Sequence, residues 1–267
     1  TYIIGLFGRM SYAAVTVELI TGEGFTKAQA GLIGTALFAV YGLCQFFAGF
    51  LGDRIAPKKM VFTGVLGSAI LNIGMGLTAD YRLMLALWSL NGVFQSLIWS
   101  PCYKVFSEIL PPSRRVQACS NAAATYPLAT VITYLFAAVA LHVLGWRSVF
   151  LLSGALMIAA AFFWLVRMSW YERLVAQYGD IEHIHLTEQE QASGGSLFYI
   201  LAVSGVLYAV VGAVTHGMLR DGIQSWVPTF MAENFSFGAS ISTALAILLP
   251  LVNITGVFLS LIHISEP

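Results

Sequence analysis

The sequence predicts an all-α protein that crosses a membrane several times. Of its 267 residues, 58% are hydrophobic and only 10% are charged, and the mean hydropathy is +0.80. A soluble domain would carry about a quarter charged residues. The apolar residues are gathered in runs of about 20, which is the length that a helix needs to cross roughly 30 Å of hydrocarbon. Short polar connectors separate the runs, so a polytopic helical membrane protein is expected.

Eight apolar runs define the expected transmembrane helices. Most connectors between them are short and contain turn-forming or charged residues, as in Thr21-Gly-Glu-Gly24 and Leu144-Gly-Trp-Arg147. Boundaries read from hydropathy are accurate to a few residues at best. The predicted spans cover residues 1–20, 28–50, 60–78, 83–106, 117–142, 148–167, 197–220 and 238–260.

One connector is much longer than the others and divides the chain. Residues 168–196 are polar, rich in Glu, Gln and His, and contain the flexible sequence Ser193-Gly-Gly. They predict a central loop between a six-helix bundle over residues 1–167 and the start of a second bundle over residues 197–260. The first residue is not Met and lies inside an apolar run, so the N-terminus is expected to be truncated.

The positive charges predict which side of the membrane each connector faces. Of the 13 Lys and Arg residues, eight lie in or beside the even-numbered connectors and three in the odd-numbered ones, with Arg9 and Arg220 left over. Cytoplasmic loops carry an excess of Lys and Arg. The even connectors, the central loop and the N-terminus are therefore expected in the cytoplasm, and the protein in the inner (plasma) membrane.

The connector after the second span carries a recognisable motif. The stretch Gly49-Phe-Leu-Gly-Asp-Arg-Ile-Ala-Pro-Lys-Lys59 places a Gly-x-x-x-Asp-Arg turn between two apolar runs. At this position it resembles the signature turn of the major facilitator superfamily, although Ala56-Pro57 stands where that pattern prefers Gly. The resemblance implies a twelve-helix fold of which about eight helices are present. It also implies a cytoplasmic gate formed by Gly49, Asp53, Arg54, Lys58 and Lys59.

Two further segments are similar to the organophosphate:phosphate antiporters of that superfamily. They are Asn91-Gly-Val-Phe-Gln-Ser-Leu-Ile-Trp-Ser-Pro-Cys102 in span four and Leu219-Arg-Asp-Gly-Ile-Gln-Ser-Trp-Val-Pro-Thr-Phe230 after span seven. The resemblance implies that Arg9 and Arg220 face a central cavity and hold an anion. The antiporters' Lys in span two is replaced by Gln45, and their His in span five falls near Ala124–Thr125. The cavity is therefore expected to be less positive than in the antiporters.

Arginine is unusual inside a membrane, and the two arginines have different positions by counting. Arg9 lies about 13 Å into its span, near the middle of the membrane. Arg220 ends an apolar run and lies near the outer face, unless its helix continues to about Trp226 and is broken at Pro228, as the resemblance requires. No Asp or Glu is expected in mid-span, which favours exchange over proton coupling. Each arginine has an alternative role as a snorkelling cation at a helix end.

Other polar residues within the spans are candidates for the lining of the cavity. Each has an alternative role as a hydrogen-bonding residue between helices, which is the commoner one in membrane proteins. These candidates are Tyr41, Gln45, Asn91, Gln95, Asn121 and Tyr126.

The predicted function is secondary active transport of a small organic anion, a phosphate ester or a carboxylate, by alternating access. Two alternatives stay open: a membrane sensor of the same fold that binds a sugar phosphate, and an exporter of neutral solutes or drugs. The sequence contains no catalytic, metal-binding or cofactor motif and no nucleic-acid-binding pattern, so an enzyme is not expected. The whole protein is expected to be a monomer in the lipid bilayer. Residues 261–267 lack the second Asp-Arg turn that the resemblance implies, and they are expected to be a non-native tail.

Overall fold

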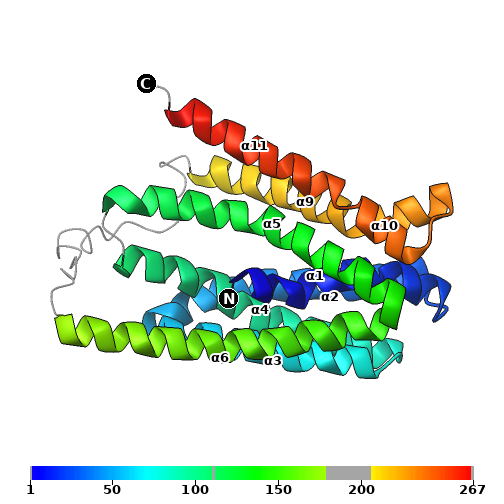
Figure 1. The fold of residues 1–267 in the computed structure, drawn as a ribbon, viewed down its shortest axis with the longest axis horizontal. Coiled ribbons are helices and arrows are strands. Elements are labelled where there is room, and N and C mark those ends of the chain that lie inside the picture. Colours follow the sequence, from blue (N-terminus) through cyan, green and yellow to red (C-terminus); the bar gives the residue numbers. More distant parts are fainter. Residues whose placement is uncertain (1, 110–111, 179–205, 266–267) are drawn as a thin grey trace.

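The computed structural model describes residues 2–109, 112–178 and 206–265, and these are almost entirely helical (Figure 1). Seven helical segments are long and apolar enough to cross a membrane on length and composition alone. The prediction of a polytopic all-α protein is confirmed. The helices are α1 (Tyr2–Thr21), α2 (Lys27–Arg54), α3 (Pro57–Leu77), α4 (Tyr81–Ile109), α5 (Pro112–Leu144), α6 (Trp146–Tyr178), α9 (Val206–Phe235), α10 (Ala239–Leu245) and α11 (Leu248–Ser265).

Local sequence explains where several helices begin and end. Thr26 caps the start of α2, and its side chain and that of Gln29 form a reciprocal capping box. Pro57 opens α3 at the first helical position, where its missing N–H is no loss. Gly24 and Gly145 follow α1 and α5 with φ values of +75° and +81°, a conformation that favours glycine. The predicted short connectors are therefore tight, capped turns.

The connectors separate into two groups at opposite ends of the bundle (Figure 1). At one end, Glu23 of the α1–α2 turn accepts hydrogen bonds from Trp146 Nε1 at 2.9 Å and from Arg147 at 3.2 Å. At the same end Lys27 pairs with Glu233 of α9 at 2.8 Å. At the other end Lys58 of α3 pairs with Glu172 of α6 at 2.6 Å. Odd and even connectors thus lie apart, as alternate crossings of a membrane require.

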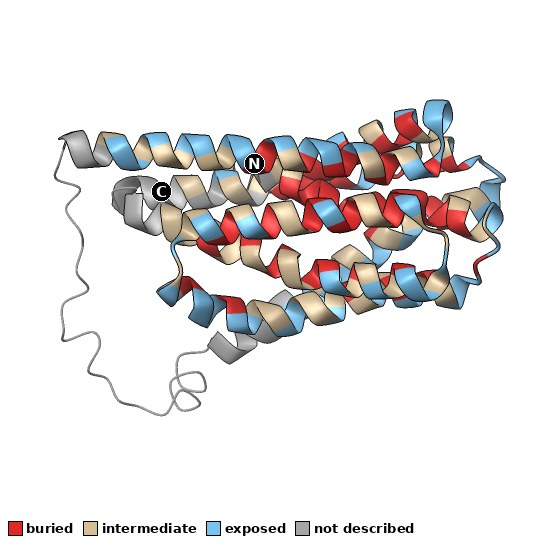
Figure 2. Ribbon diagram, turned by 90° about the horizontal axis from the view of Figure 1, so that it is seen from below, coloured by how far each residue is buried: buried red, intermediate tan, exposed pale blue. Residues whose placement is uncertain are grey.

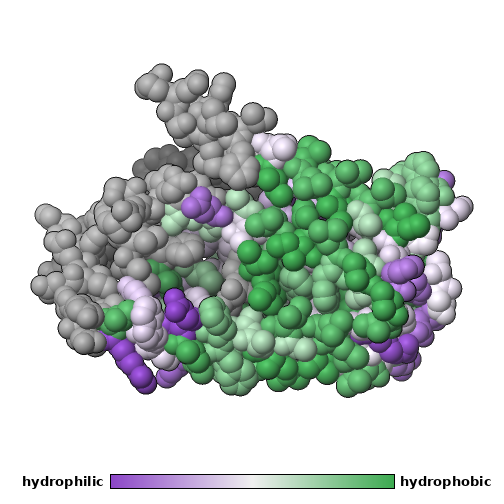
Figure 3. Space-filling model, in the orientation of Figure 1, coloured by the Kyte–Doolittle hydropathy of each residue, from purple (hydrophilic) through white to green (hydrophobic). Residues whose placement is uncertain are grey.

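An aromatic cluster packs α1, α4 and α6 against one another. Trp88 lies between Tyr12 and Phe150, with ring centroids 5.4 and 5.8 Å apart, and all three side chains are buried. Figure 2 shows the buried residues along the inward faces of the helices. Exposed apolar side chains cover the middle of the surface, and hydrophilic ones gather toward the ends (Figure 3). This distribution is that of a protein surrounded by hydrocarbon.

Two predicted boundaries are wrong in their position. Helix α6 continues to Tyr178, so the first part of the predicted loop 168–196 is helical, and its later part lies outside the described residues. Helix α9 continues through Pro228 to Phe235, so Pro228 does not end it. The first error arises because hydropathy marks where apolar residues stop, whereas a helix continues for as long as its backbone hydrogen bonds can form. The second arises because a proline inside a helix removes one hydrogen bond without always ending the helix. The predicted span 238–260 contains a break, since α10 ends at Leu245 and α11 begins at Leu248.

Candidate substrate site

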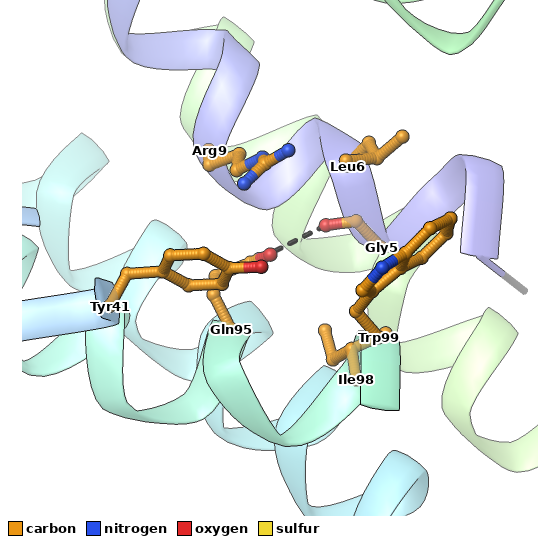
Figure 4. A pocket seen from close by; sticks show the side chains of 7 residues that line it. All are labelled: Gly5, Leu6, Arg9, Tyr41, Gln95, Ile98 and Trp99. Carbon is orange, nitrogen blue, oxygen red and sulfur yellow. Dashed lines mark hydrogen bonds between the residues drawn. The ribbon is translucent and has the colours of Figure 1, made fainter. Parts of the chain in front are cut away.

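Arg9 projects from α1 into a small pocket between α1, α2 and α4 (Figure 4). Its guanidinium carbon lies 5.4 Å from the ring centroid of Tyr41 in α2 and 5.4 Å from that of Tyr126 in α5. A cation over the face of a tyrosine ring is attracted by about 0.5–2 kcal/mol. The residues that line the pocket are Gly5, Leu6, Arg9, Tyr41, Gln95, Ile98 and Trp99.

Arg220 also contacts the ring of Tyr126. Its guanidinium carbon is 4.2 Å from the centroid of that ring. Tyr126 is buried, so both guanidinium groups lie against one buried ring. The two cations cannot be farther apart than the sum of their distances to the ring. Residues from α1, α5 and α9, far apart in the sequence, therefore meet at one place.

Both arginines lie deep within their helices. Measured from the end where Lys27 pairs with Glu233, Arg9 is ~18 Å before Thr21 and Arg220 is ~22 Å before Phe235 along the helix axis. Helix α9 continues beyond Trp226, as the resemblance requires, so Arg220 lies near the middle of its helix. Helix α9 is not among the seven candidate spans in the described residues, so the depth of Arg220 in a membrane stays a prediction.

The structure places a carboxylate beside Arg220, in a helix that is not among the seven candidate membrane spans of the described residues. Asp221 lies in the middle of α9, where its Oδ1 accepts hydrogen bonds from Arg220 Nε at 2.8 Å and from the Tyr126 hydroxyl at 2.9 Å. Adjacent residues on a helix point in different directions, so this contact requires both side chains to bend toward Tyr126. The pairing compensates the charge of each and lowers the cost of burying them. The exchange mechanism inferred from the missing carboxylate loses its support.

Asn91 and Gln95 bind neighbouring helices. Asn91 Nδ2 donates to the Gly8 carbonyl at 2.6 Å, and its Oδ1 accepts from Ser68 at 2.6 Å. Gln95 Nε2 donates to the Gly5 carbonyl at 3.0 Å and to the Ser68 hydroxyl at 2.8 Å. Gln95 also borders the Arg9 pocket, but Asn91 is fully buried. Both residues thus join α1, α3 and α4, which is the alternative role that the sequence left open.

We expect Asn91→Leu to destabilise the protein, because Asn91 joins helices and does not border the Arg9 pocket. The change leaves the Gly8 carbonyl and the Ser68 hydroxyl with fewer partners, which costs about 1–3 kcal/mol per buried group. The melting temperature of the purified protein in detergent measures this effect. Asn234→Leu is the matched control, because Asn234 is exposed and bonds only within its own helix. A variant that melts like the unaltered protein would show that the network contributes nothing.

Two other predicted lining residues have hydrogen bonds of their own. Gln45 Nε2 donates to the Ser100 hydroxyl, which ties α2 to α4. Asn121 is exposed on α5, and its carbonyl accepts from Thr125 at 3.0 Å. Neither borders the Arg9 pocket. Among the predicted residues, the structure brings together Arg9, Tyr41, Gln95, Tyr126 and Arg220.

The predicted gate residues occupy the end of α2 and the start of α3. Only Ile55 and Ala56 are non-helical, so most of the motif is part of a helix. Gly49 is exposed, and a Cβ added there meets no described atom within 4 Å. Arg54 and Lys59 are exposed, whereas Lys58 pairs with Glu172. Asp53 is in the last turn of α2, and its side chain lies outside what the structure describes.

Sequence reasoning missed a cation at this gate. Lys104 of α4 donates to the Gly52 carbonyl at 2.7 Å, at the C-terminal end of α2. A cation is favoured there because the last carbonyls of a helix carry partial negative charge. The position of Lys104 in the sequence of α4 does not predict this contact, because the contact depends on how α2 and α4 cross. Within the described residues, no three His, Cys, Asp or Glu side chains are grouped to hold a metal ion.

Comparison with known families agrees with this geometry. The family model described as "Major Facilitator Superfamily" matches residues 1–264. The chain belongs to the major facilitator superfamily. It is accordingly a multi-pass membrane protein.

Several curated relatives in this superfamily are similar to the chain. A "Probable hexose phosphate transport protein" of Chlamydia muridarum is 28% identical over 62% of this chain and 37% of its own length. The "Glycerol-3-phosphate transporter" of Bacillus subtilis is 27% identical over 84% of this chain and 54% of its own. The "Membrane sensor protein UhpC" of Salmonella typhimurium is 26% identical over 91% of this chain and 57% of its own length. The chain thus spans between about a third and three fifths of the length of these relatives.

A solved structure shows the same fold. It is a bacterial homologue of the human lysosomal transporter Spinster in an inward-facing, unoccupied conformation. The TM-score is 0.73 at 18% sequence identity, over 96% of this chain and 60% of the other. The major facilitator arrangement therefore extends over nearly the whole of this chain.

Proposed function

We propose that this chain is part of a secondary transporter that moves a small organic anion by alternating access. The observation that carries the proposal is the pair of guanidinium groups of Arg9 and Arg220 on the ring of Tyr126, deep within the helices. An arginine at mid-membrane costs roughly 2.5–3.5 kcal/mol or more. Two guanidinium groups this close together repel each other, and a bound anion that contacts both would add to the compensation that Asp221 gives Arg220.

The chemistry of arginine suits a phosphate ester or a carboxylate. A guanidinium presents N–H donors in a planar fork that matches two oxygens of such a group, and charge-assisted hydrogen bonds are the stronger kind. The similarity to carriers named for hexose phosphate and glycerol 3-phosphate supports an anionic solute. No enzymatic step is part of this proposal.

The two arginines belong to different groups of helices. Arg9 is on α1 and Arg220 on α9, the first described helix after the central segment. In transporters of this type, substrates bind near the midplane between two repeats that rock against each other. An anion that bridges Arg9 and Arg220 would therefore link the motion of one group to the other. We propose the inner (plasma) membrane and a cytoplasmic N-terminus from the distribution of Lys and Arg.

Uptake into proteoliposomes tests the proposal. The full-length protein is reconstituted, and entry of labelled glycerol 3-phosphate, hexose phosphate and small carboxylates is followed with and without unlabelled anion inside. Saturable uptake of at least one anion is expected, with empty liposomes as the control. Uptake of neutral drugs alone would contradict the proposal and favour the exporter.

Tyr126 is expected to hold the arginines in place. Tyr126→Phe keeps the ring but removes the hydrogen bond to Asp221, and a hydrogen bond to a charged group contributes about 1.5–3 kcal/mol. We expect Tyr126→Phe to weaken anion binding about tenfold, and Tyr126→Leu, which also removes the ring, to weaken it further. Calorimetric titration measures the dissociation constants. If both variants bind like the unaltered protein, the ring has no part in the site.

A sensor is the second candidate. It is favoured by the similarity to UhpC, which extends over 91% of this chain. A sensor needs the same anion site but no transport cycle. Anion binding by the reconstituted protein without uptake or exchange would favour the sensor over the transporter.

A further inference from the structure

We propose that Gln95 of α4 is a positioning residue that holds Arg9 where it can bind the solute. This inference rests on the proposed function and gives a part in it to a residue that acts on Arg9 through the backbone of α1. Gln95 is 4% exposed and borders the pocket beside Arg9. Figure 4 shows its side chain reaching the main chain of α1 at Gly5.

The hydrogen bond from Gln95 meets the turn of α1 that ends at Arg9. Gln95 Nε2 donates to the Gly5 carbonyl at 3.0 Å. In an α-helix the N–H of each residue bonds to the carbonyl four residues earlier, so the helical acceptor for the Arg9 N–H is the same Gly5 carbonyl. A carbonyl oxygen has two lone pairs and can accept both bonds. The amide of Gln95 is therefore joined to the main chain of Arg9 through one oxygen atom.

Further hydrogen bonds fix the amide of Gln95 itself. Its Nε2 also donates to the Ser68 hydroxyl at 2.8 Å, and that hydroxyl donates to Asn91 Oδ1 at 2.6 Å. Asn91 Nδ2 in turn donates to the Gly8 carbonyl at 2.6 Å. The side chains of Ser68, Asn91 and Gln95 are all buried. Helices α3 and α4 thus hold α1 at two carbonyl groups, those of Gly5 and Gly8.

These contacts restrict the rotation of α1 about its axis. Successive residues of an α-helix are about 100° apart, so Gly5, Gly8 and Arg9 all project within about 100° of one another. A Cβ added to Gly8 would lie 2.5 Å from both Gln95 Nε2 and Ser68 Oγ, so α1 lies directly on these groups. A rotation of α1 that displaced Arg9 would break their bonds. Groups that bind a ligand must be held to within about 0.5 Å, and this cluster holds Arg9 in that way.

Anion binding by variants of the purified full-length protein tests the inference. Dissociation constants for glycerol 3-phosphate and glycerate are measured by calorimetry, well below the melting temperature of each variant. Gln95→Leu should weaken binding by about tenfold, the factor that corresponds to one buried hydrogen bond. Ser68→Ala removes one of the two bonds of the Gln95 amide and should weaken binding less.

A matched control removes a different buried bond to α1. Thr243 is buried, and its hydroxyl donates to the Ala14 carbonyl at 3.2 Å, more than one turn beyond Arg9. Thr243→Val should lower the melting temperature and leave the dissociation constants unchanged. A loss of affinity in Thr243→Val as large as that in Gln95→Leu overturns the inference, because any loosening of α1 would then have the same effect.

A further variant separates an effect through α1 from a direct contact between Gln95 and the solute. Gly8→Ala keeps every polar group of the cluster and every residue that lines the pocket, but its Cβ pushes α1 away. It should weaken anion binding at least as much as Gln95→Leu. Binding by Gly8→Ala equal to that of the unaltered protein overturns the inference. If Gly8→Ala does not fold, unchanged binding by Ser68→Ala overturns it instead, since Ser68 is not among the residues that line the pocket.

The unaltered protein distinguishes failure of this inference from failure of the proposed function. Where it binds either anion and the variants contradict the expected order, the inference fails and the proposed function stands. If the unaltered protein binds neither anion, the proposed function fails and the inference fails with it.

Discussion

Arg220→Ala in the full-length protein is expected to abolish anion uptake, by about 100-fold or more, while the protein stays in the membrane at normal abundance. Removing one partner of a hydrogen-bonded charge pair costs about 2–5 kcal/mol or more. Here the removed partner, Arg220, is also proposed to bind the solute. Initial rates of uptake into proteoliposomes measure the effect. Immunoblots of the membranes measure abundance.

Several controls separate loss of the ligand from loss of the fold. Arg220→Ala leaves Asp221 without its cation, so the double variant Arg220→Ala with Asp221→Asn is expected to restore stability but not uptake. Arg220→Lys keeps the charge but not the planar fork, and intermediate uptake is expected. Arg147→Ala removes an exposed arginine at the end of the bundle and should leave uptake unchanged. Normal uptake by Arg220→Ala would contradict the anion site.

Gly92→Leu is expected to prevent α2 and α4 from packing. A Cβ at position 92 would lie 2.6 Å from the Leu37 carbonyl oxygen and 2.9 Å from the Tyr41 nitrogen. These are backbone atoms, so the two helices themselves must move apart. Even Gly92→Ala is expected to cost about 1–3 kcal/mol, the usual range for overpacking. The yield of monodisperse protein in detergent and its melting temperature measure the loss.

The partner helix offers a matched control for this substitution. Gly42 is exposed on α2, and a Cβ there meets no described atom within 4 Å. Gly42→Leu in the 267-residue chain should therefore fold like the unaltered chain. Equal yields and melting temperatures for Gly42→Leu and Gly92→Leu would show that the crossing of α2 and α4 tolerates a side chain. Because Gly92 packs against Tyr41, its variants are also expected to disturb the Arg9 pocket.

Hydropathy predicted the helices well where their charge was low. The spans over α1 to α6 follow from apolar runs, since a membrane helix must cover a fixed thickness with apolar side chains. Hydropathy did not predict the extent of α9, because Arg220 and Asp221 interrupt its apolar run. The charges of these two side chains compensate each other in the folded structure. The two residues are adjacent in the sequence, but only the position of Tyr126 shows that they form a pair.

The candidate site was predictable only in part. Arg9 and Arg220 stand out in the sequence because an arginine inside an apolar run needs a partner. Asn91 and Gln45 have the same polar character as Tyr41, but which of them bonds to another helix depends on helix rotation and crossing. In each case the role of the residue depends on where the fold places its side chain.

The contact between Lys104 and the Gly52 carbonyl has a consequence for which substitutions can break it. The acceptor belongs to the main chain, so a mutation that changes the side chain at position 52 leaves the acceptor in place. A mutation at position 104 that removes the ammonium group abolishes the contact. The link between α2 and α4 at this point therefore depends on the identity of one residue and not of the other.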